Sequence, residues 1–183
     1  MKYKNYSAVG FVIGRKKYGE ADRILILFTK THGKISVIAK GVRKLTSRKR
    51  GGIEIFSEIK FSAINSSSLD ILTEVEVINT YDRIRADLRL LSVAYYFCEV
   101  VGKVTQEEEK HDMVYEIMQK YFNEITKTKN LKKLRTEFVR EILVVLGFWP
   151  HDKPMVNPDM ILESVTERKI NSFRVGRKML QKD

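Results

Sequence analysis

The hydrophobic pattern of this 183-residue chain changes character once, near Asn79. Before that point, short apolar runs rich in Ile, Val and Phe are separated by turn signals, which is typical of β-strands. The runs cover residues 7–14, 23–29, 34–40, 53–61 and 69–78. In the last run, period two places Ile71, Thr73, Val75 and Val77 on one face and Leu72, Glu74 and Glu76 on the other. Five short strands avoid open edges by closing into a barrel, so the pattern predicts an OB fold.

After Tyr81 the apolar residues recur at steps of three and four, which indicates α-helices. The first predicted helix is long and largely buried, and its apolar positions are Leu88, Leu91, Tyr95, Cys98 and Val101. Residues 105–108, Thr-Gln-Glu-Glu, form a capping box that predicts the start of a second helix. A third is predicted from about Leu131 to Gly147, a residue type that commonly follows a helix end.

Two further helices are predicted, one beginning at Asn157-Pro158-Asp159 and one over residues 171–180. The chain is therefore expected to be an α+β protein in which the strands precede the helices. We expect an OB-fold barrel at residues 1–79 and an all-helical domain at residues 80–183, without a zinc module.

The net charge of +11 is confined to the first third of the chain. Residues 1–60 hold 15 basic and 4 acidic side chains, whereas residues 61–183 hold 19 of each. The densest basic segment contains Lys40, Arg43, Lys44, Arg48, Lys49 and Arg50. Such confinement favours a module that binds a polyanion. A solvated loop that only keeps the chain soluble is the alternative.

Binding of single strands needs flat apolar faces as well as cations. Candidates near the basic segment are Tyr18 in the first turn and three residues of the apolar runs, Phe28, Phe56 and Phe61. Core packing is the alternative for all of them, least so for Tyr18, which sits in a charged turn. A second, weaker basic cluster near the end of the sequence contains Arg168, Lys169, Arg174, Arg177 and Lys178.

Residue patterns for enzymatic chemistry are scarce. His32, His111 and His151 are far apart and the chain has one cysteine, so no zinc ligand set of the usual spacing can be written, and we expect no cofactor. The sequence has no Walker phosphate loop and none of the common hydrolase motifs. A two-metal nuclease would have to draw on Glu20, Asp22, Glu74 or Glu76, residues that also suit ion pairs and a solvated strand face.

Cellular location is predicted from the cysteine and from the first residues. Cys98 lies in an apolar stretch, which indicates a buried side chain and no disulfide framework. The apolar run near the N-terminus is short and soon followed by charges, unlike a signal peptide or a membrane span. We therefore expect a cytoplasmic protein that does not bind membranes, and binding of a nucleic-acid polyanion would make it nucleoid-associated.

Residues 14–61 resemble the N-terminal barrel of the RecO family of bacterial recombination mediators. The resemblance is carried by Tyr-Gly-Glu-Ala-Asp at 18–22, Thr29, Gly33-Lys34, Ala-Lys-Gly at 39–41 with its basic loop, and Phe56. Residues 138–148, which end in Leu-Gly-Phe, are similar to that family's helical segment. The match covers roughly the first 80 residues well and the rest loosely.

The resemblance implies a non-enzymatic protein of DNA repair and recombination. It implies binding of single- and double-stranded DNA, annealing of complementary strands, and association with RecR and with the acidic, Phe-ended tail of single-strand-binding protein. Through these partners it implies help in loading RecA. Many family members carry a four-cysteine zinc module after the Leu-Gly-aromatic segment, whereas residues 151–159 contain no cysteine here, and the chain is short after Trp149.

The resemblance also suggests functional residues. Basic positions around the family's barrel match Lys34, Lys40, Arg43, Lys44, Arg48, Lys49 and Arg50, which we expect to contact DNA phosphates. For the protein tail it points to the helical half, where Lys132 and Arg135 lie beside Leu131 and Leu134. A solvated helix start is the alternative for these two. An RNA-binding or ribosome-associated OB module and a metal-dependent nuclease are the competing functions.

Overall fold

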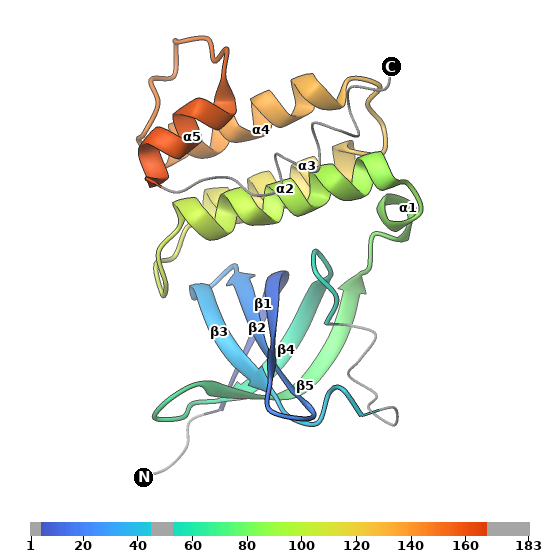
Figure 1. The fold of residues 1–183 in the computed structure, drawn as a ribbon. Coiled ribbons are helices and arrows are strands. Elements are labelled where there is room, and N and C mark those ends of the chain that lie inside the picture. Colours follow the sequence, from blue (N-terminus) through green and yellow to red (C-terminus); the bar gives the residue numbers. More distant parts are fainter. Residues whose placement is uncertain (1–4, 45–52, 168–183) are drawn as a thin grey trace. The chain divides into compact units, whose positions relative to one another are not determined.

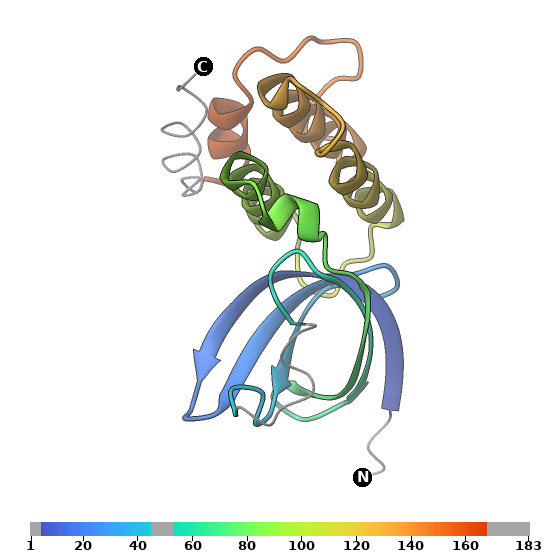
Figure 2. The same cartoon turned by 90° about the vertical axis from the view of Figure 1, so that its right-hand side faces the viewer.

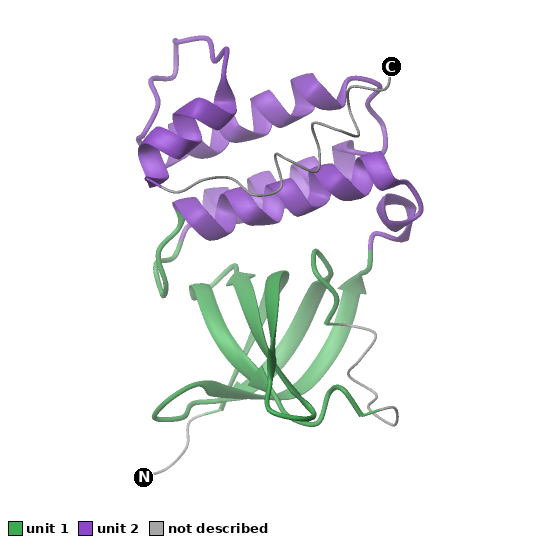
Figure 3. Ribbon diagram, in the orientation of Figure 1, with its two compact units in different colours: residues 1–80, 105–110 green, residues 81–104, 111–183 purple. Residues whose placement is uncertain are grey.

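The structure is a computed structural model that describes residues 5–44 and 53–167. The chain divides into two compact units, distinguished by colour in Figure 3. The barrel unit comprises residues 1–80 and 105–110, and the helical unit comprises residues 81–104 and 111–183. The units depart from a single boundary at residue 79 mainly in one segment, residues 105–110, which belongs with the barrel.

The barrel unit is a closed five-stranded barrel, which confirms the predicted OB-fold architecture. Its strands are β1 (Asn5–Tyr18), β2 (Asp22–Thr29), β3 (Gly33–Ala39), β4 (Glu58–Ile64) and β5 (Asp70–Asn79). Their order around the barrel is β1-β2-β3-β5-β4, and the parallel pairing of β3 with β5 and the antiparallel pairing of β1 with β4 complete the closure. The long, curved β1 pairs with β2 as well (Figure 2). Alternate side chains point inward and form an apolar core that includes Val12, Leu25, Leu27, Val37 and Phe61.

The fourth apolar run, predicted as a strand over residues 53–61, enters a strand only at Glu58. Before it, Phe56 has a left-handed backbone with φ of 58°, which breaks the extended conformation. Phe56 N donates to Val12 O at 2.7 Å, and Val12 N donates to Ser57 O at 2.9 Å. Ile53 and Phe56 are fully buried. This part of the run is therefore a buried turn that closes one side of the core.

The predicted face assignment in β5 is wrong for Leu72. A β-bulge shifts the register between β4 and β5, so that Ala63 faces Leu72 while Ser62 faces Glu74. Thr73 is the extra residue, and it donates its hydroxyl to Ser62 O at 3.0 Å. The bulge moves Leu72 into the core on the same side as Val75.

The helical unit contains α1 (Asp82–Arg85), α2 (Leu88–Val104), α3 (Asp112–Glu124), α4 (Leu131–Val145) and α5 (Pro158–Thr166). The ring of Phe97 on α2 lies 4.0 Å from that of Phe138 on α4 and 5.9 Å from that of Tyr121 on α3, between ring centroids. These contacts join three helices around one aromatic core. As predicted, α4 begins near Leu131, where Asn130 caps Lys133 N at 2.9 Å, and the chain turns at Gly147 with φ of 77°. The helix predicted at residues 171–180 lies outside the described residues.

The capping-box prediction is wrong, because α3 begins at Asp112 rather than after Thr105. Residues 105–110 belong to the barrel unit and pack against its strand β3. Glu108 N donates to Lys34 O at 2.8 Å, and the Lys34 ammonium donates to Thr105 O. Glu108 has φ of 61°, which no helix residue adopts. Pairing with the barrel therefore outweighs the local helix-start signal.

Candidate nucleic-acid interface

The β1–β2 hairpin presents two lysines that are not among the DNA contacts predicted from the sequence. Lys16 faces Ile24 and Lys17 faces Arg23 in the hairpin register, and both lysine side chains are exposed. The next pair, Tyr18 and Asp22, flanks the turn. The hairpin thus places positive charge close to the turn between the first two strands.

Residues 41–43, which follow β3, are hydrogen-bonded to this turn. Gly41 N donates to Asp22 Oδ1 at 2.7 Å, and Arg43 N donates to Ala21 O at 2.9 Å. The Arg43 guanidinium also donates to Gly19 O at 3.3 Å. These three bonds bring the predicted basic segment against the hairpin, although the two are separated by about 20 residues in sequence. Lys40 and Lys44, on either side of the bonded residues, are exposed.

We call Lys16, Lys17, Lys40, Arg43 and Lys44 the hairpin cluster. Within the described ranges, the four lysine ammonium groups of the cluster have no ion pair or hydrogen bond, and the exposed acid in the turn is Glu20. Two nearby arginines differ, because Arg15 and Arg23 both pair with Glu54, the latter at 3.7 Å. OB folds commonly bind nucleic acids with their second and third strands and the adjoining β1–β2 loop. The hairpin cluster occupies that region of the barrel.

The other predicted DNA contacts have different positions. Lys34 is the second residue of β3, whereas Lys40 follows the end of that strand, so the two residues lie roughly 20 Å apart along it. The Lys34 ammonium is bound to Thr105 O and is partly buried, so it serves a contact inside the barrel unit. Arg48, Lys49 and Arg50 lie outside the described residues, as does the second basic cluster from Arg168 onward.

Of the four aromatic candidates, Tyr18 alone is exposed. Half of its surface is accessible to solvent, against 1% or less for Phe28, Phe56 and Phe61. The three phenylalanines are therefore core residues, and only the turn tyrosine could meet a ligand.

The charge of the two parts differs less than the division at residue 60 suggests. Strand β5 adds Asp70, Glu74 and Glu76 to the barrel and no cation. Residues 105–110, which belong to the barrel unit, add three acidic side chains and one basic one. The barrel unit then holds 16 basic and 10 acidic side chains, a net charge of +6, and the helical unit holds 18 and 13, a net charge of +5. The positive charge is therefore concentrated in the hairpin and the basic segment rather than in the barrel unit as a whole.

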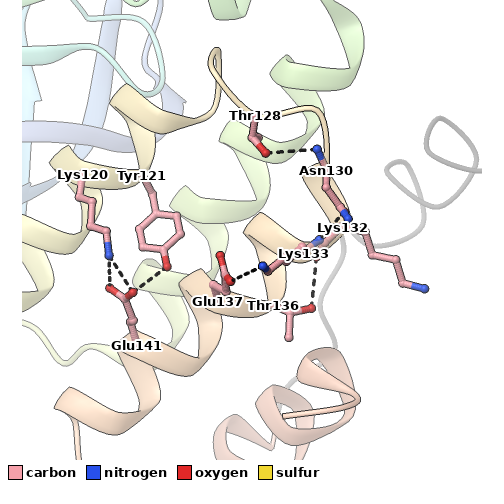
Figure 4. A network of polar contacts seen from close by, with 9 residues as sticks. All are labelled: Lys120, Tyr121, Thr128, Asn130, Lys132, Lys133, Thr136, Glu137 and Glu141. Atoms are coloured by element: carbon pink, nitrogen blue, oxygen red, sulfur yellow. Dashed lines mark hydrogen bonds and ion pairs between the residues drawn. The ribbon is translucent and has the colours of Figure 1, made fainter. Parts of the chain in front are cut away.

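In the helical unit, a cavity of about 590 Å³ lies where α4 begins. Its apolar lining includes Leu90, Ile125 and Leu131, and its charged lining consists of Asp87, Arg89, Lys129 and Lys132. Figure 4 shows the Lys132 side chain extending away from the polar network formed by Lys133, Glu137 and their neighbours. The cavity thus combines an apolar surface with available cations.

Arg135, the other predicted tail contact, is engaged inside the helical unit. Its side chain is 11% exposed and its Nη2 lies 3.4 Å from both carboxylate oxygens of Asp159 on α5. The guanidinium carbon lies 4.0 Å from the ring centroid of Tyr96, whose hydroxyl donates to Asp159 Oδ1 at 2.7 Å. Burial raises the pKa of Tyr96, and the negative charge of Asp159 raises it further. This triad joins α2, α4 and α5, so Arg135 serves helix packing.

Neither a metal centre nor a membrane span is found in the part of the chain that the structure describes. His, Cys, Asp and Glu side chains form no group of three or more that could hold a metal ion within these ranges. No helix there has the length and apolar character needed to cross a bilayer.

Fold and site together define an OB-fold protein with a basic β1–β2 turn and an appended helical unit. Two family models match the sequence: "Recombination protein O N terminal" over residues 1–81 and "Recombination protein O C terminal" over residues 85–151. The chain therefore belongs to the RecO family.

Several curated relatives carry the name DNA repair protein RecO. The protein from Listeria monocytogenes serotype 4b (strain CLIP80459) is 31% identical over 141 residues, which cover 77% of this chain and 55% of the relative. The protein from Alkaliphilus metalliredigens is 32% identical over 143 residues, covering 78% and 58%. The protein from Symbiobacterium thermophilum is 27% identical over 146 residues, covering 79% and 58%. The chain thus spans somewhat more than half the length of the relatives it matches.

Proposed function

We propose that this chain is a non-enzymatic mediator of DNA repair and recombination in the cytoplasm. In this proposal the barrel binds single- and double-stranded DNA and anneals complementary strands. The protein acts with RecR at gaps coated by single-strand-binding protein and so helps to load RecA. The observation that supports it is the hairpin cluster, a group of available cations on the OB barrel of a chain whose relatives are named as DNA repair proteins.

The hairpin cluster supports binding without sequence preference. Lysine ammonium groups neutralise phosphates and release condensed counterions, a contact that single and double strands offer alike. Neutralising the phosphates of two strands also lowers their mutual repulsion, which favours annealing. We assign the contact to the hairpin cluster and, outside the described residues, to Arg48, Lys49 and Arg50. Lys34 is left out because its ammonium is bound to Thr105 O.

Titration of fluorescently labelled DNA at several salt concentrations tests the DNA contact. The triple variant Lys16→Ala, Lys17→Ala, Lys44→Ala removes three contacts, so the slope of log K against log[salt] for a single strand should flatten by about 2. The matched control replaces three exposed lysines of the helical unit, Lys127, Lys129 and Lys132, and should leave the slope unchanged. An equal loss in both variants would show that only net charge matters. The same titration with RNA addresses the RNA-binding alternative, because a preference for RNA of equal length would favour it.

We infer that the tail of single-strand-binding protein binds in the cavity at the start of α4. Leu90, Ile125 and Leu131 provide an apolar surface for the terminal Phe ring, and Lys129 and Lys132 can pair with carboxylates. We assign the second carboxylate contact to Lys129 instead of Arg135, because the Arg135 guanidinium is held by Asp159. Loss of one charge-assisted hydrogen bond costs about 1.5 kcal/mol, so Lys132→Ala should lower the affinity for the tail peptide roughly tenfold. Lys127→Ala is the control, since Lys127 is exposed but does not line this cavity.

A further inference from the structure

Tyr18 is an aromatic side chain that the core of the barrel does not enclose. Half of its surface is exposed at the end of β1, whereas Phe11, Phe28 and Phe61 are at most 1% exposed. Its cross-strand neighbour is Asp22, whose carboxylate accepts from Gly41 N. Among the described residues, no hydrogen bond or ring contact involves the Tyr18 side chain.

The surroundings of Tyr18 point to an anionic ligand that also has a flat face. Lys16, two positions before it on β1, shares its face of the strand, and the Arg43 guanidinium donates to the carbonyl of Gly19, the residue that follows it. The ring therefore lies next to cations of the hairpin cluster. A tyrosine exposed among cations can stack on a nucleobase while its neighbours hold the phosphates on either side.

We propose that Tyr18 stacks on a base of a single strand and makes the barrel discriminate between single- and double-stranded DNA. The inference rests on the proposed DNA binding by the hairpin cluster and adds the strand preference. Phosphates are presented by both forms, so the cations bind both. In a duplex the bases are already stacked on one another, and a ring on a surface turn reaches only a base that is free of its partner.

Equilibrium titrations of the full chain with a labelled single strand and with a hairpin duplex of equal length test this assignment. Tyr18→Ala should weaken single-strand binding at least about fivefold and leave duplex binding unchanged. Tyr18→Phe, which keeps the ring, should bind both like the wild-type chain. The salt slope should stay the same in both variants, because no charge is removed.

A second measurement uses only the wild-type chain, so it does not depend on the folding of a variant. A strand with abasic sites has the phosphates but lacks the bases, and it should bind the wild-type chain as weakly as the normal strand binds Tyr18→Ala. Equal losses on single strand and duplex, or full affinity for the abasic strand, would overturn the stacking role. Failure of the wild-type chain to bind either form would instead refute the proposed function on which it rests.

Discussion

Replacing Arg135 by Ala should destabilise the helical unit. Lys132, one turn earlier on α4, is exposed, whereas the Arg135 side chain is largely buried. Arg135 on α4 contacts Asp159 and the ring of Tyr96, and its side chain is 11% exposed. Removal would leave the Asp159 carboxylate, itself only 22% exposed, with the Tyr96 hydroxyl as its remaining partner in the triad.

The size of the effect follows from burial and distance. Breaking a fully buried ion pair costs about 3–5 kcal/mol, but the 3.4 Å separations and the partial exposure of Asp159 call for a smaller value. A cation over an aromatic ring adds about 1–2 kcal/mol when it is shielded from water. We expect a total loss of about 2–3 kcal/mol. For a cooperative unit of about 100 residues, this lowers Tm by roughly 10 °C.

Chemical and thermal unfolding followed by circular dichroism measure this loss. The control is Lys133→Ala, which removes an ion pair with Glu137 in which the side chains are 71% and 49% exposed. Such a surface pair contributes at most about 0.5 kcal/mol. A double-mutant cycle with Asp159→Ala should give a coupling energy of about 1 kcal/mol or more.

Similar losses for the Arg135 and Lys133 variants, or a coupling energy near zero, would refute the reasoning. The outcome also decides which variant can test tail binding. If Arg135→Ala is destabilising, Arg135→Glu would be more so, because it places a second carboxylate beside Asp159. Its loss of peptide binding would then reflect misfolding. Lys132→Ala avoids this ambiguity, because Lys132 is exposed.

Three further outcomes are expected. Gly33→Ala should cost more than Gly19→Ala, because both have positive φ but only at Gly33 would the new Cβ meet a backbone atom, 1.9 Å from Glu109 O; urea unfolding of the two variants measures the difference, and equal costs would contradict the docking of residues 105–110. Burial, with neighbouring carboxylates, raises the pKa of Tyr96 and Tyr121. Since the pKa of each tyrosine is higher in the folded state than the unfolded value of 10.0, its contribution to the free energy of unfolding is fully present below about pH 10. That contribution is lost as pH rises further. Unfolding free energies between pH 8 and 11 should show this fall, less steeply in Tyr96→Phe. Elemental analysis after dialysis against a chelator should find well below one zinc per chain, and one retained zinc per chain would contradict the ligand argument.

The barrel was predictable because its strands are marked by local patterns. Alternation, β-branched residues and turn signals occur within each run and need no knowledge of distant contacts. The errors arose where a distant strand decides the local structure. The bulge at Thr73 depends on pairing with Ser62, and the left-handed turn at Phe56 depends on hydrogen bonding with Val12.

The capping box at Thr105 shows the same competition between local and tertiary contacts. Its residue types suit a helix start, yet the Glu108 amide bonds to Lys34 O in the barrel unit. A capping interaction contributes about 1 kcal/mol, and two hydrogen bonds with Lys34 of β3 contribute about 1 kcal/mol each. By contrast, α4 begins at Leu131 as predicted, and Asn130 caps it by accepting from Lys133 N.

The candidate site was predictable as a charge but not as a set of side chains. Residues 1–60 hold 15 basic and 4 acidic side chains, so binding of a polyanion is predicted without the structure. Which cations remain available depends on acceptors that only the fold brings near. Lys34 meets Thr105 O and Arg135 meets Asp159, whereas Lys16 and Lys17 join the basic segment because Arg43 bonds to the hairpin turn. Variants with equal net charge but different positions, such as the Lys16, Lys17, Lys44 set and its helical control, therefore separate a binding site from a general electrostatic attraction.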